Sequence, residues 1–382
     1  MKINCNVCKS FLNKKIYDSS INKSVTSLSK IINFRTKVFI CDNCQHIQTS
    51  KIPNEFSYYD NNYKILLDSE EEDQIYTIKN NKIIYRNQYQ AKLLLKKIYI
   101  SSSKKILDYG CGKASTMREI KKLNKSISPF LFDVSKDYVK YWNNFVSKNN
   151  QAIYKLPKKW MGNFNLVTSF FVLEHITKLK ETLENIKKTL VRGGLFYAII
   201  PNTFTNPGDL VVADHPNHFT VNSLKYIFSK IGFNLIEIDE TSHNGAYIVI
   251  AENTLTSKQK LSKDRTLKKK ILRLGKFWSS TAKRIRKFEK KLPKTSKSVI
   301  YGAGFYGTFL ASSLINHKKI ICFLDQNKFL NGRTMLGKPI ITPSKFPKCT
   351  DIIYVALNPK NSRKIIKTSK FFTSKKFKFF YI

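Results

Sequence analysis

The stretch Lys104–Ser115, which reads KKILDYGCGKAS, decides the fold of this chain. Its apolar start is typical of a buried strand, and Asp108, Gly110 and Gly112 follow as a D-x-G-x-G turn. Glycines let a backbone turn tightly and approach a ligand without a Cβ clash. A helix is expected over 116–123, so the stretch predicts a strand, turn and helix that approach a nucleotide-like cofactor.

The segments after this turn extend it into a sheet. Ser128–Asp133 is a second apolar segment, and its final acid can accept hydrogen bonds from both hydroxyls of a ribose. A further strand is expected over Phe164–Phe170, and it leads directly into VLEHI at Val172–Ile176. A Gly-Gly turn at 193–194 then opens the strand LFYAII. Alternating strand and helix signals over 101–253 predict an α/β fold with a mainly parallel sheet.

Two cysteine pairs near the N-terminus indicate a metal site. Cys5-x2-Cys8 and Cys41-x2-Cys44 are separated by 32 residues. Four thiolates complete a closed tetrahedral site, which is the arrangement of structural zinc. Four unrelated buried cysteines are the alternative. No export signal is visible at the N-terminus, and this favours metal thiolates over disulfides and a cytoplasmic location.

The chain is strongly basic, with a formal net charge of +42. Between Lys258 and Lys297, seventeen Lys and Arg face only Asp264 and Glu289, and apolar residues recur there at helical spacing. We expect a basic linking helix with a docked apolar stripe and solvated lysines. Nucleic-acid binding is the alternative, but lysine is abundant throughout the chain, and the same field would attract anionic small substrates.

A second glycine turn lies in the C-terminal part. Val299–Gly307 reads VIYGAGFYG, and Ile320–Asp325 is a strand that ends in an acid about 20 residues later. Taken alone, this spacing predicts an NAD site and a second Rossmann-like α/β lobe. No run approaches the ~20 apolar residues that a membrane span needs.

Residues 85–253 resemble the class I S-adenosylmethionine-dependent methyltransferases, in the DYGCGKA turn, the FD that ends at Asp133 and the VLEHI segment. The resemblance implies a Rossmann-like core that binds S-adenosylmethionine. It assigns the cofactor to residues at the strand ends: Asp108, Gly110 and Gly112 for the methionine part, Asp133 for the ribose, with Phe170 and Glu174 nearby. One departure is visible, because no clear acid lies between Gln151 and Trp160 to bind the adenine amino group.

The order of parts over nearly the whole chain resembles the sugar C-methyltransferases, which act on nucleotide-linked keto-deoxysugars. It implies a zinc-binding module over 1–84, the methyltransferase domain over 85–253, the basic helix over 254–297 and a C-terminal Rossmann-like lobe over 298–382. In that family the C-terminal lobe helps to bind the sugar nucleotide, and no nicotinamide is used. The expected product would serve a polysaccharide or a glycosylated metabolite.

The loop DHPNHFT at Asp214–Thr220 is the candidate acceptor site. A histidine of near-neutral pKa can take a proton at cellular pH. The family carries Tyr-His-Glu-His at this place, and matching the final histidines puts His218 on its base, Asn217 on its Glu and His215 on its Tyr. The two differences leave carbon, oxygen and nitrogen acceptors open, and the histidines could instead cap the following helix. A small-molecule O- or N-methyltransferase and a zinc-containing nucleic-acid-binding protein are the alternative functions, and the oligomeric state stays open.

Overall fold

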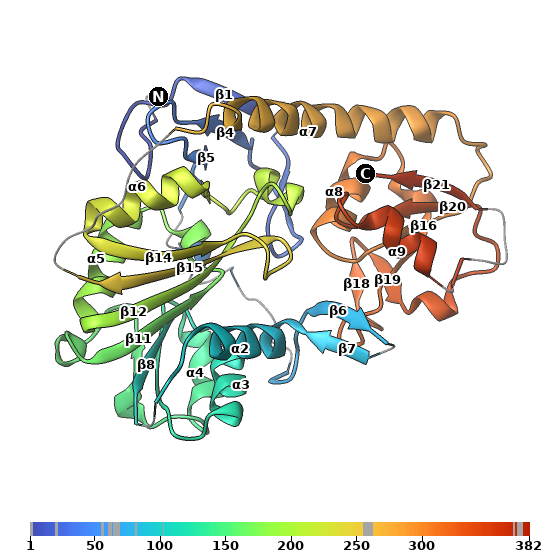
Figure 1. The fold of residues 1–382 in the computed structure, drawn as a ribbon. Coiled ribbons are helices and arrows are strands. Elements are labelled where there is room, and N and C mark those ends of the chain that lie inside the picture. The colour runs from blue at the N-terminus through green and yellow to red at the C-terminus, as the bar shows by residue number, and fades with distance from the viewer. Residues whose placement is uncertain are drawn as a thin grey trace. The chain divides into compact units, whose positions relative to one another are not determined.

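Figure 1 shows the computed structural model, which describes residues 3–19, 22–54, 57–59, 63, 69–80, 82–101, 103–254, 263–369, 371–372 and 377–382. The chain divides into two compact units, and each is assembled from three separate stretches. The first unit comprises Met1–Leu12, Cys41–Asn202 and Pro216–Asp264. The second unit comprises Asn13–Ile40, Thr203–His215 and Arg265–Ile382. The predicted boundaries at 84, 253 and 297 stay predictions.

A seven-stranded sheet forms the centre of the first unit. In sheet order its strands are β10 (Gln151–Ile153), β9 (Ser128–Asp133), β8 (Lys105–Tyr109), β11 (Phe164–Phe170), β12 (Leu190–Pro201), β15 (Ala246–Asn253) and β14 (Phe233–Asp239). The first five run parallel, whereas β15 is antiparallel to both of its neighbours. The Rossmann-like α/β core with a mainly parallel sheet is therefore confirmed.

Helices cover both faces of this sheet (Figure 1). They are α2 (Arg86–Lys97), α3 (Ser115–Leu123), α4 (Val139–Trp142), α5 (Leu179–Thr189) and α6 (Val221–Ile231). Leu94 of α2, Met117 of α3 and Trp142 of α4 share one buried cluster with the inner strands. Each of these apolar side chains is fully buried and stabilises the fold by ~1.5–3 kcal/mol. The predicted helix over 116–123 is confirmed as α3.

The sequence predicted that the Gly-Gly pair at 193–194 opens a strand, and this prediction is wrong. β12 already begins at Leu190, and the pair lies inside it. There the pairing with β11 jumps from Phe164 opposite Leu190 to Leu166 opposite Leu195. Gly193 has φ +74, a conformation that glycine adopts at no steric cost. The pair therefore lies in a bulge that takes up the extra residues of β12. Beyond this bulge the two parallel strands pair residue by residue again.

Short strands complete the first unit. The hairpin β6 (Ile75–Lys79) and β7 (Lys82–Tyr85) precedes α2, and β5 (Ile47–Thr49) pairs antiparallel with β13 (Asn217–His218). The pairing of β5 with β13 joins the segment after the second cysteine pair to the predicted acceptor loop. Helix α6 begins at a capping box made by Thr220 and Ser223, so no histidine caps it.

The second unit contains a long helix, α7 (Leu267–Lys290), which packs against strand β1 (Lys14–Asp18). Strand β1 pairs antiparallel with β4 (Lys37–Ile40), and β2 (Ser24–Val25) pairs with β3 (Ile31–Ile32). A Cβ on Gly275 would lie 2.2 Å from the carbonyl oxygen of Ile16, so only glycine allows the helix and strand to approach this closely.

Helix α7 confirms a basic amphipathic helix in this part of the chain. The apolar stripe expected from the helical spacing is formed by Leu267, Ile271, Trp278 and Ile285, which are buried, and by Leu274 and Phe288, which are half-buried. Its lysines and arginines are exposed. Within the predicted range 254–297, residues 255–262 lie outside the described part of the chain.

A second sheet of six strands forms the C-terminal part of this unit. In order its strands are β18 (Thr334–Met335), β19 (Lys338–Ile341), β17 (Ile320–Leu324), β16 (Ser298–Tyr301), β20 (Ile352–Val355) and β21 (Lys378–Tyr381). All pairs except β18 with β19 are parallel. Helices α8 (Phe305–Ser313) and α9 (Ser362–Thr368) complete it. Among the helices described here, none is long and apolar enough to cross a bilayer.

Candidate active site

The predicted cofactor turn connects β8 to α3. Gly110 has φ +75, and a Cβ there would lie 2.5 Å from the side chain of Val172, the first residue of VLEHI. The glycine is therefore required by the close approach of the segment that follows β11. Gly112 has φ +50, and its carbonyl oxygen accepts a hydrogen bond from Trp142 Nε1 at 2.7 Å. The structure thus brings the predicted turn and the predicted VLEHI segment into direct contact.

Two buried carboxylates lie beside this turn. Asp133 ends β9, and its two oxygens accept backbone hydrogen bonds from Gly112 at 2.8 Å and Ser135 at 3.1 Å. Asp108 ends the apolar part of β8 and accepts a hydrogen bond from Thr168 Oγ1 at 2.8 Å. Burial raises the pKa of Asp133 to about 6 and that of Asp108 to about 7. A carboxylate has about four acceptor positions, so Asp133 retains acceptor capacity for a ligand hydroxyl.

An exposed aromatic residue follows β10, where sequence reasoning found no acid. Tyr154 has φ +63, and its backbone N donates to the carbonyl oxygen of Asp133 at 3.0 Å. Its side chain is 43% exposed, and Val134, after β9, is 41% exposed. Exposed apolar side chains at adjacent strand ends can contact a flat ring. The sequence signal for Tyr154 was an aromatic residue directly after a short strand, which the search for an acid overlooked.

Arg86, the first residue of α2, is a second residue that sequence reasoning missed. Its guanidinium lies 5.1 Å from the centre of the Phe171 ring, directly after β11. Its Nε is buried and has no hydrogen-bond partner among the described residues. A buried donor without a partner is costly, which indicates that a hydrogen-bond acceptor completes this position. The electrostatic neighbours of Arg86 include Glu174, which is itself buried.

The predicted acceptor loop is docked onto the segment that follows β11 through Asn217. Its Nδ2 donates to the carbonyl oxygens of Leu173 and Ile176 at 2.9 and 2.6 Å. Its Oδ1 accepts from Asn6 Nδ2 at 2.9 Å and lies 3.2 Å from His46 Nε2. These four contacts occupy the amide of a side chain that is 1% exposed. Asn217 therefore connects both cysteine-bearing segments to VLEHI.

His218 is also fully buried. Its Nε2 lies 2.8 Å from Thr49 Oγ1 on β5, a contact that fixes the orientation of the imidazole. The structure thus places the predicted base next to Asn217 on β13, within the same unit as the cofactor turn. His218 as a base stays a prediction.

His175 lies in a short helix, Leu173–His175. This helix directly follows Val172, the residue that lies against the predicted cofactor turn. Its two ring nitrogens each lie 3.2 Å from a phenol oxygen, Nδ1 from Tyr59 and Nε2 from Tyr63. A neutral imidazole has one donor and one acceptor nitrogen, so one phenol donates to the ring while the other accepts from it. Such a chain of hydrogen bonds can carry a proton. His175 is half-buried, whereas His218 has no exposed surface.

His215 belongs to the second unit. Its Nδ1 lies 2.7 Å from Asp209 Oδ1, and the other oxygen of Asp209 accepts a hydrogen bond from Thr203 Oγ1 at 2.6 Å. The carboxylate therefore orients the ring of His215 through Nδ1. The unit boundary falls between His215 and Pro216, within the predicted acceptor loop.

The four N-terminal cysteines converge in the first unit. The sulfur of Cys5 lies 3.6 Å from that of Cys44, and Cys8 lies 3.4 Å from Cys41, with all four sulfurs within 4.8 Å of one another. Zinc–sulfur bonds of ~2.3 Å in a tetrahedron require sulfurs about 3.8 Å apart. The donor set and its spacing therefore fit a closed four-thiolate metal site.

The C-terminal glycine turn has a structural explanation. A Cβ on Gly302 would lie 2.3 Å from the carbonyl oxygen of Ala356, and one on Gly307 would lie 2.1 Å from that of Gly302. The oxygens of Asp325 accept backbone hydrogen bonds from Ala303 and Asn327 at 2.9 and 2.8 Å. Backbone packing thus requires two of the three glycines, and the acid holds the turn together.

Residues 84–238 match the family model of the methyltransferase domain. Similar solved structures include an S-adenosylmethionine-dependent methyltransferase from Mesorhizobium loti (13% identity, 43% of this chain, 97% of that chain, TM-score 0.36) and one from Aquifex aeolicus (14%, 44%, 92%, 0.36). No curated protein matches the sequence. The turn at Gly110 and the acid at Asp133 both lie within this match, which identifies residues 84–238 as a methyltransferase domain.

Proposed function

We propose that this methyltransferase transfers a methyl group to a nucleotide-activated keto-deoxysugar, at a carbon atom. The observation that carries the proposal is the docking of the acceptor loop, through Asn217, onto the segment that contacts the cofactor turn. It places His218 and His175 in one unit with the donor site. The order of parts along the chain, with a second parallel sheet at the C-terminus, supports a sugar nucleotide as the acceptor.

In this proposal the donor is held by residues at the ends of three strands and at the start of α2. Asp133 accepts hydrogen bonds from the ribose hydroxyls, and Tyr154 stacks on the adenine. The unpartnered Nε of Arg86 binds the carboxylate of the methionine part. S-Adenosylmethionine supplies an electrophilic methyl group on a sulfonium.

Proton removal is the step that the protein must supply. A base takes the proton from the carbon beside the ketone, and the electron pair of the C–H bond forms an enolate. The enolate carbon then forms a bond to the methyl group as the carbon–sulfur bond breaks, and S-adenosylhomocysteine leaves. We propose His218 as this base, oriented by Thr49, and we keep His175, which contacts two tyrosines, as the alternative base. A positioned base contributes ~10²–10⁴-fold to the rate.

We also propose that the four cysteines hold one structural zinc ion. With four thiolates the metal has no open position for a substrate, so its part is to fix the two cysteine-bearing segments. Asn6 lies between Cys5 and Cys8, and His46 follows Cys44, and both contact Asn217. Zinc would therefore stabilise the position of the acceptor loop.

The experiment that tests the function is mass spectrometry of activated-sugar pools incubated with the protein and a methyl-labelled donor. A mass gain on a nucleotide sugar would support the proposal. Label on unrelated small molecules, with none on nucleotide sugars, would instead support the small-molecule O- or N-methyltransferase. Exchange of the sugar's acidic proton with deuterated water would assign the acceptor to carbon, and methyl transfer without such exchange would favour oxygen.

Two variants separate the histidines. His218→Ala should lose both exchange and methyl transfer by ~10²–10⁴-fold and still bind S-adenosylhomocysteine. His175→Ala should slow methyl transfer less, because His218 remains in place as the base. The reverse order of effects would move the base to His175, and full activity in both variants would remove the proposed base altogether.

A further inference from the structure

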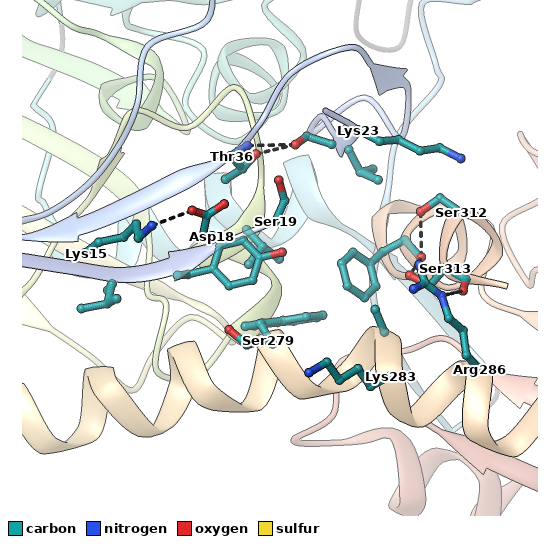
Figure 2. Close-up of a pocket in the computed structure, with 18 residues that line it drawn as sticks. Lys15, Asp18, Ser19, Lys23, Thr36, Ser279, Lys283, Arg286, Ser312 and Ser313 are labelled. Atoms are coloured by element: carbon teal, nitrogen blue, oxygen red, sulfur yellow. Dashed lines mark hydrogen bonds and ion pairs between the residues drawn. The ribbon is translucent and has the colours of Figure 1, made fainter. Parts of the chain in front are cut away.

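A pocket of about 470 Å³ lies in the second unit, and none of its lining residues belongs to the donor site. Figure 2 shows it among strand β1, helix α7 and the last turn of α8. Its volume falls within the ~300–1,000 Å³ that small-molecule sites occupy. All lining residues belong to the second unit, so the pocket is defined by that unit's own packing.

Positive charge is in excess around this pocket. Asp18 is the one acid among the described residues that line it, and it is already paired with Lys15 at 2.7 Å and with Arg35 at 2.8 Å. Lys23 and Lys283 also line the pocket, and the described residues offer neither of them an acidic partner within salt-bridge distance. The pocket therefore attracts an anion.

Arg286 removes the main electrostatic obstacle to an anion. The last turn of α8 exposes carbonyl oxygens, and the negative end of a helix dipole disfavours anions. Arg286 Nε donates to the carbonyl oxygen of Ser313 at 3.1 Å, so it provides a partner for the C-terminal end of α8 (Figure 2). The other N–H groups of the guanidinium remain to bind a ligand. The hydroxyls of Ser312 and Ser313 donate to the carbonyl oxygen of Phe309, so their protons are already used. The lysine and arginine side chains are therefore the groups that would bind the anion.

Aromatic side chains form part of the wall of this pocket. Trp278 and Phe309 meet edge to face with ring centres 4.9 Å apart, and Tyr17 also lines the pocket. The indole nitrogen of Trp278 donates to the carbonyl oxygen of Pro207 at 2.8 Å, which fixes the ring in place. A rigid aromatic wall can contact the ring or carbon skeleton of a ligand.

We propose that this pocket binds a phosphorylated small molecule. Lys283 and Arg286 bind its phosphate, and the wall of Tyr17, Trp278 and Phe309 contacts its carbon skeleton. The inference does not rest on the proposed function, because it uses only residues of the second unit. The phosphate could belong to the methyl acceptor itself or to a separate ligand, and the test distinguishes the two sources.

The test is isothermal titration of the full chain with inorganic pyrophosphate, at physiological salt and without methyl donor. Losing one charge-assisted hydrogen bond should weaken binding about tenfold or more in Lys283→Met. Lys290→Met is the matched control, because Lys290 is an exposed lysine of the same helix that does not line the pocket. Phenyl phosphate should bind more tightly than inorganic phosphate, because its ring gains the aromatic wall.

Absent binding, or an equal loss in Lys283→Met and Lys290→Met, would overturn the proposal, because diffuse attraction to a basic chain would then explain the data. Equal affinities for phenyl phosphate and inorganic phosphate would overturn the role of the wall. A methyl-transfer assay with added pyrophosphate distinguishes the two sources of the phosphate. If pyrophosphate raises only the KM of the acceptor, the phosphate belongs to the methyl acceptor. Pyrophosphate that changes kcat supports a separate ligand.

Discussion

Replacing Asn217 by aspartate should destabilise the protein rather than remove a catalytic group. The substitution keeps the oxygen near Asn6 and His46 but removes the amide that donates to the carbonyl oxygens of Leu173 and Ile176. Each buried acceptor left without a donor costs ~1–3 kcal/mol, so we expect a loss of ~2–6 kcal/mol. For a domain of ~150–250 residues this lowers the melting temperature by ~2–4 °C per kcal/mol.

The assay is thermal unfolding followed by circular dichroism, with S-adenosylhomocysteine binding measured on the same samples. A drop of at least about 4 °C is expected. Asn143→Asp is the matched control, because Asn143 is exposed and its side-chain oxygen accepts only a long, 3.5 Å contact from Gln151. Its melting temperature should change little, as is usual for surface substitutions. An Asn217→Asp protein that melts like the wild type but does not turn over would refute this reasoning and support the catalytic part that the sequence match implies.

Three further predictions concern the metal, the donor and nucleic acid. Elemental analysis should find one zinc ion per chain, and Cys41→Ser should lose it together with thermal stability; a metal-free, equally stable wild type would contradict this. Asp133→Ala should bind S-adenosylhomocysteine at least tenfold more weakly, because it loses charge-assisted hydrogen bonds worth ~1.5–3 kcal/mol each. Because the ionised carboxylate accepts hydrogen bonds from the ribose and the pKa of Asp133 is about 6, wild-type affinity should fall as the pH is lowered through 6. Asp133→Asn should lose this step, and Asp108, whose pKa is about 7, then remains the titrating carboxylate of the site. Duplex DNA should bind only at ~10⁻⁴–10⁻⁶ M in a gel-shift titration at physiological salt, and nanomolar, sequence-dependent binding would disprove the solvated-lysine interpretation of α7.

The local elements of the donor site could be predicted from the sequence because each is encoded by neighbouring residues. The apolar run before Asp108, the glycines after it and the acid at Asp133 each specify a strand end or a turn within a few positions. Helix α7 could be predicted for the same reason, since its apolar stripe has a helical period.

The rest depends on residues far apart in the chain. Asn217 contacts Asn6 across 211 positions and Leu173 across 44, and no local pattern indicates those partners. The sequence therefore suggested a catalytic part for Asn217, whereas its amide is occupied by four contacts. Tyr154, which we propose to stack on the adenine, was overlooked because stacking needs no fixed motif. The bulge at Gly193 arises from the register of β11 and β12, which only the assembled sheet defines.

The interleaving of the two units has a consequence for how this protein can be made and divided. The chain passes from one unit to the other after residues 12, 40, 202, 215 and 264. During synthesis, strand β1 leaves the ribosome long before the helix α7 that packs against it, and such long-range contacts slow folding. A fragment ending near residue 253 would hold the whole methyltransferase sheet, yet its residues 13–40 and 203–215 would lack their partners and expose apolar surface. We therefore expect a fragment that ends near residue 253 to aggregate, and a protease nick to leave the two halves associated until the protein is denatured.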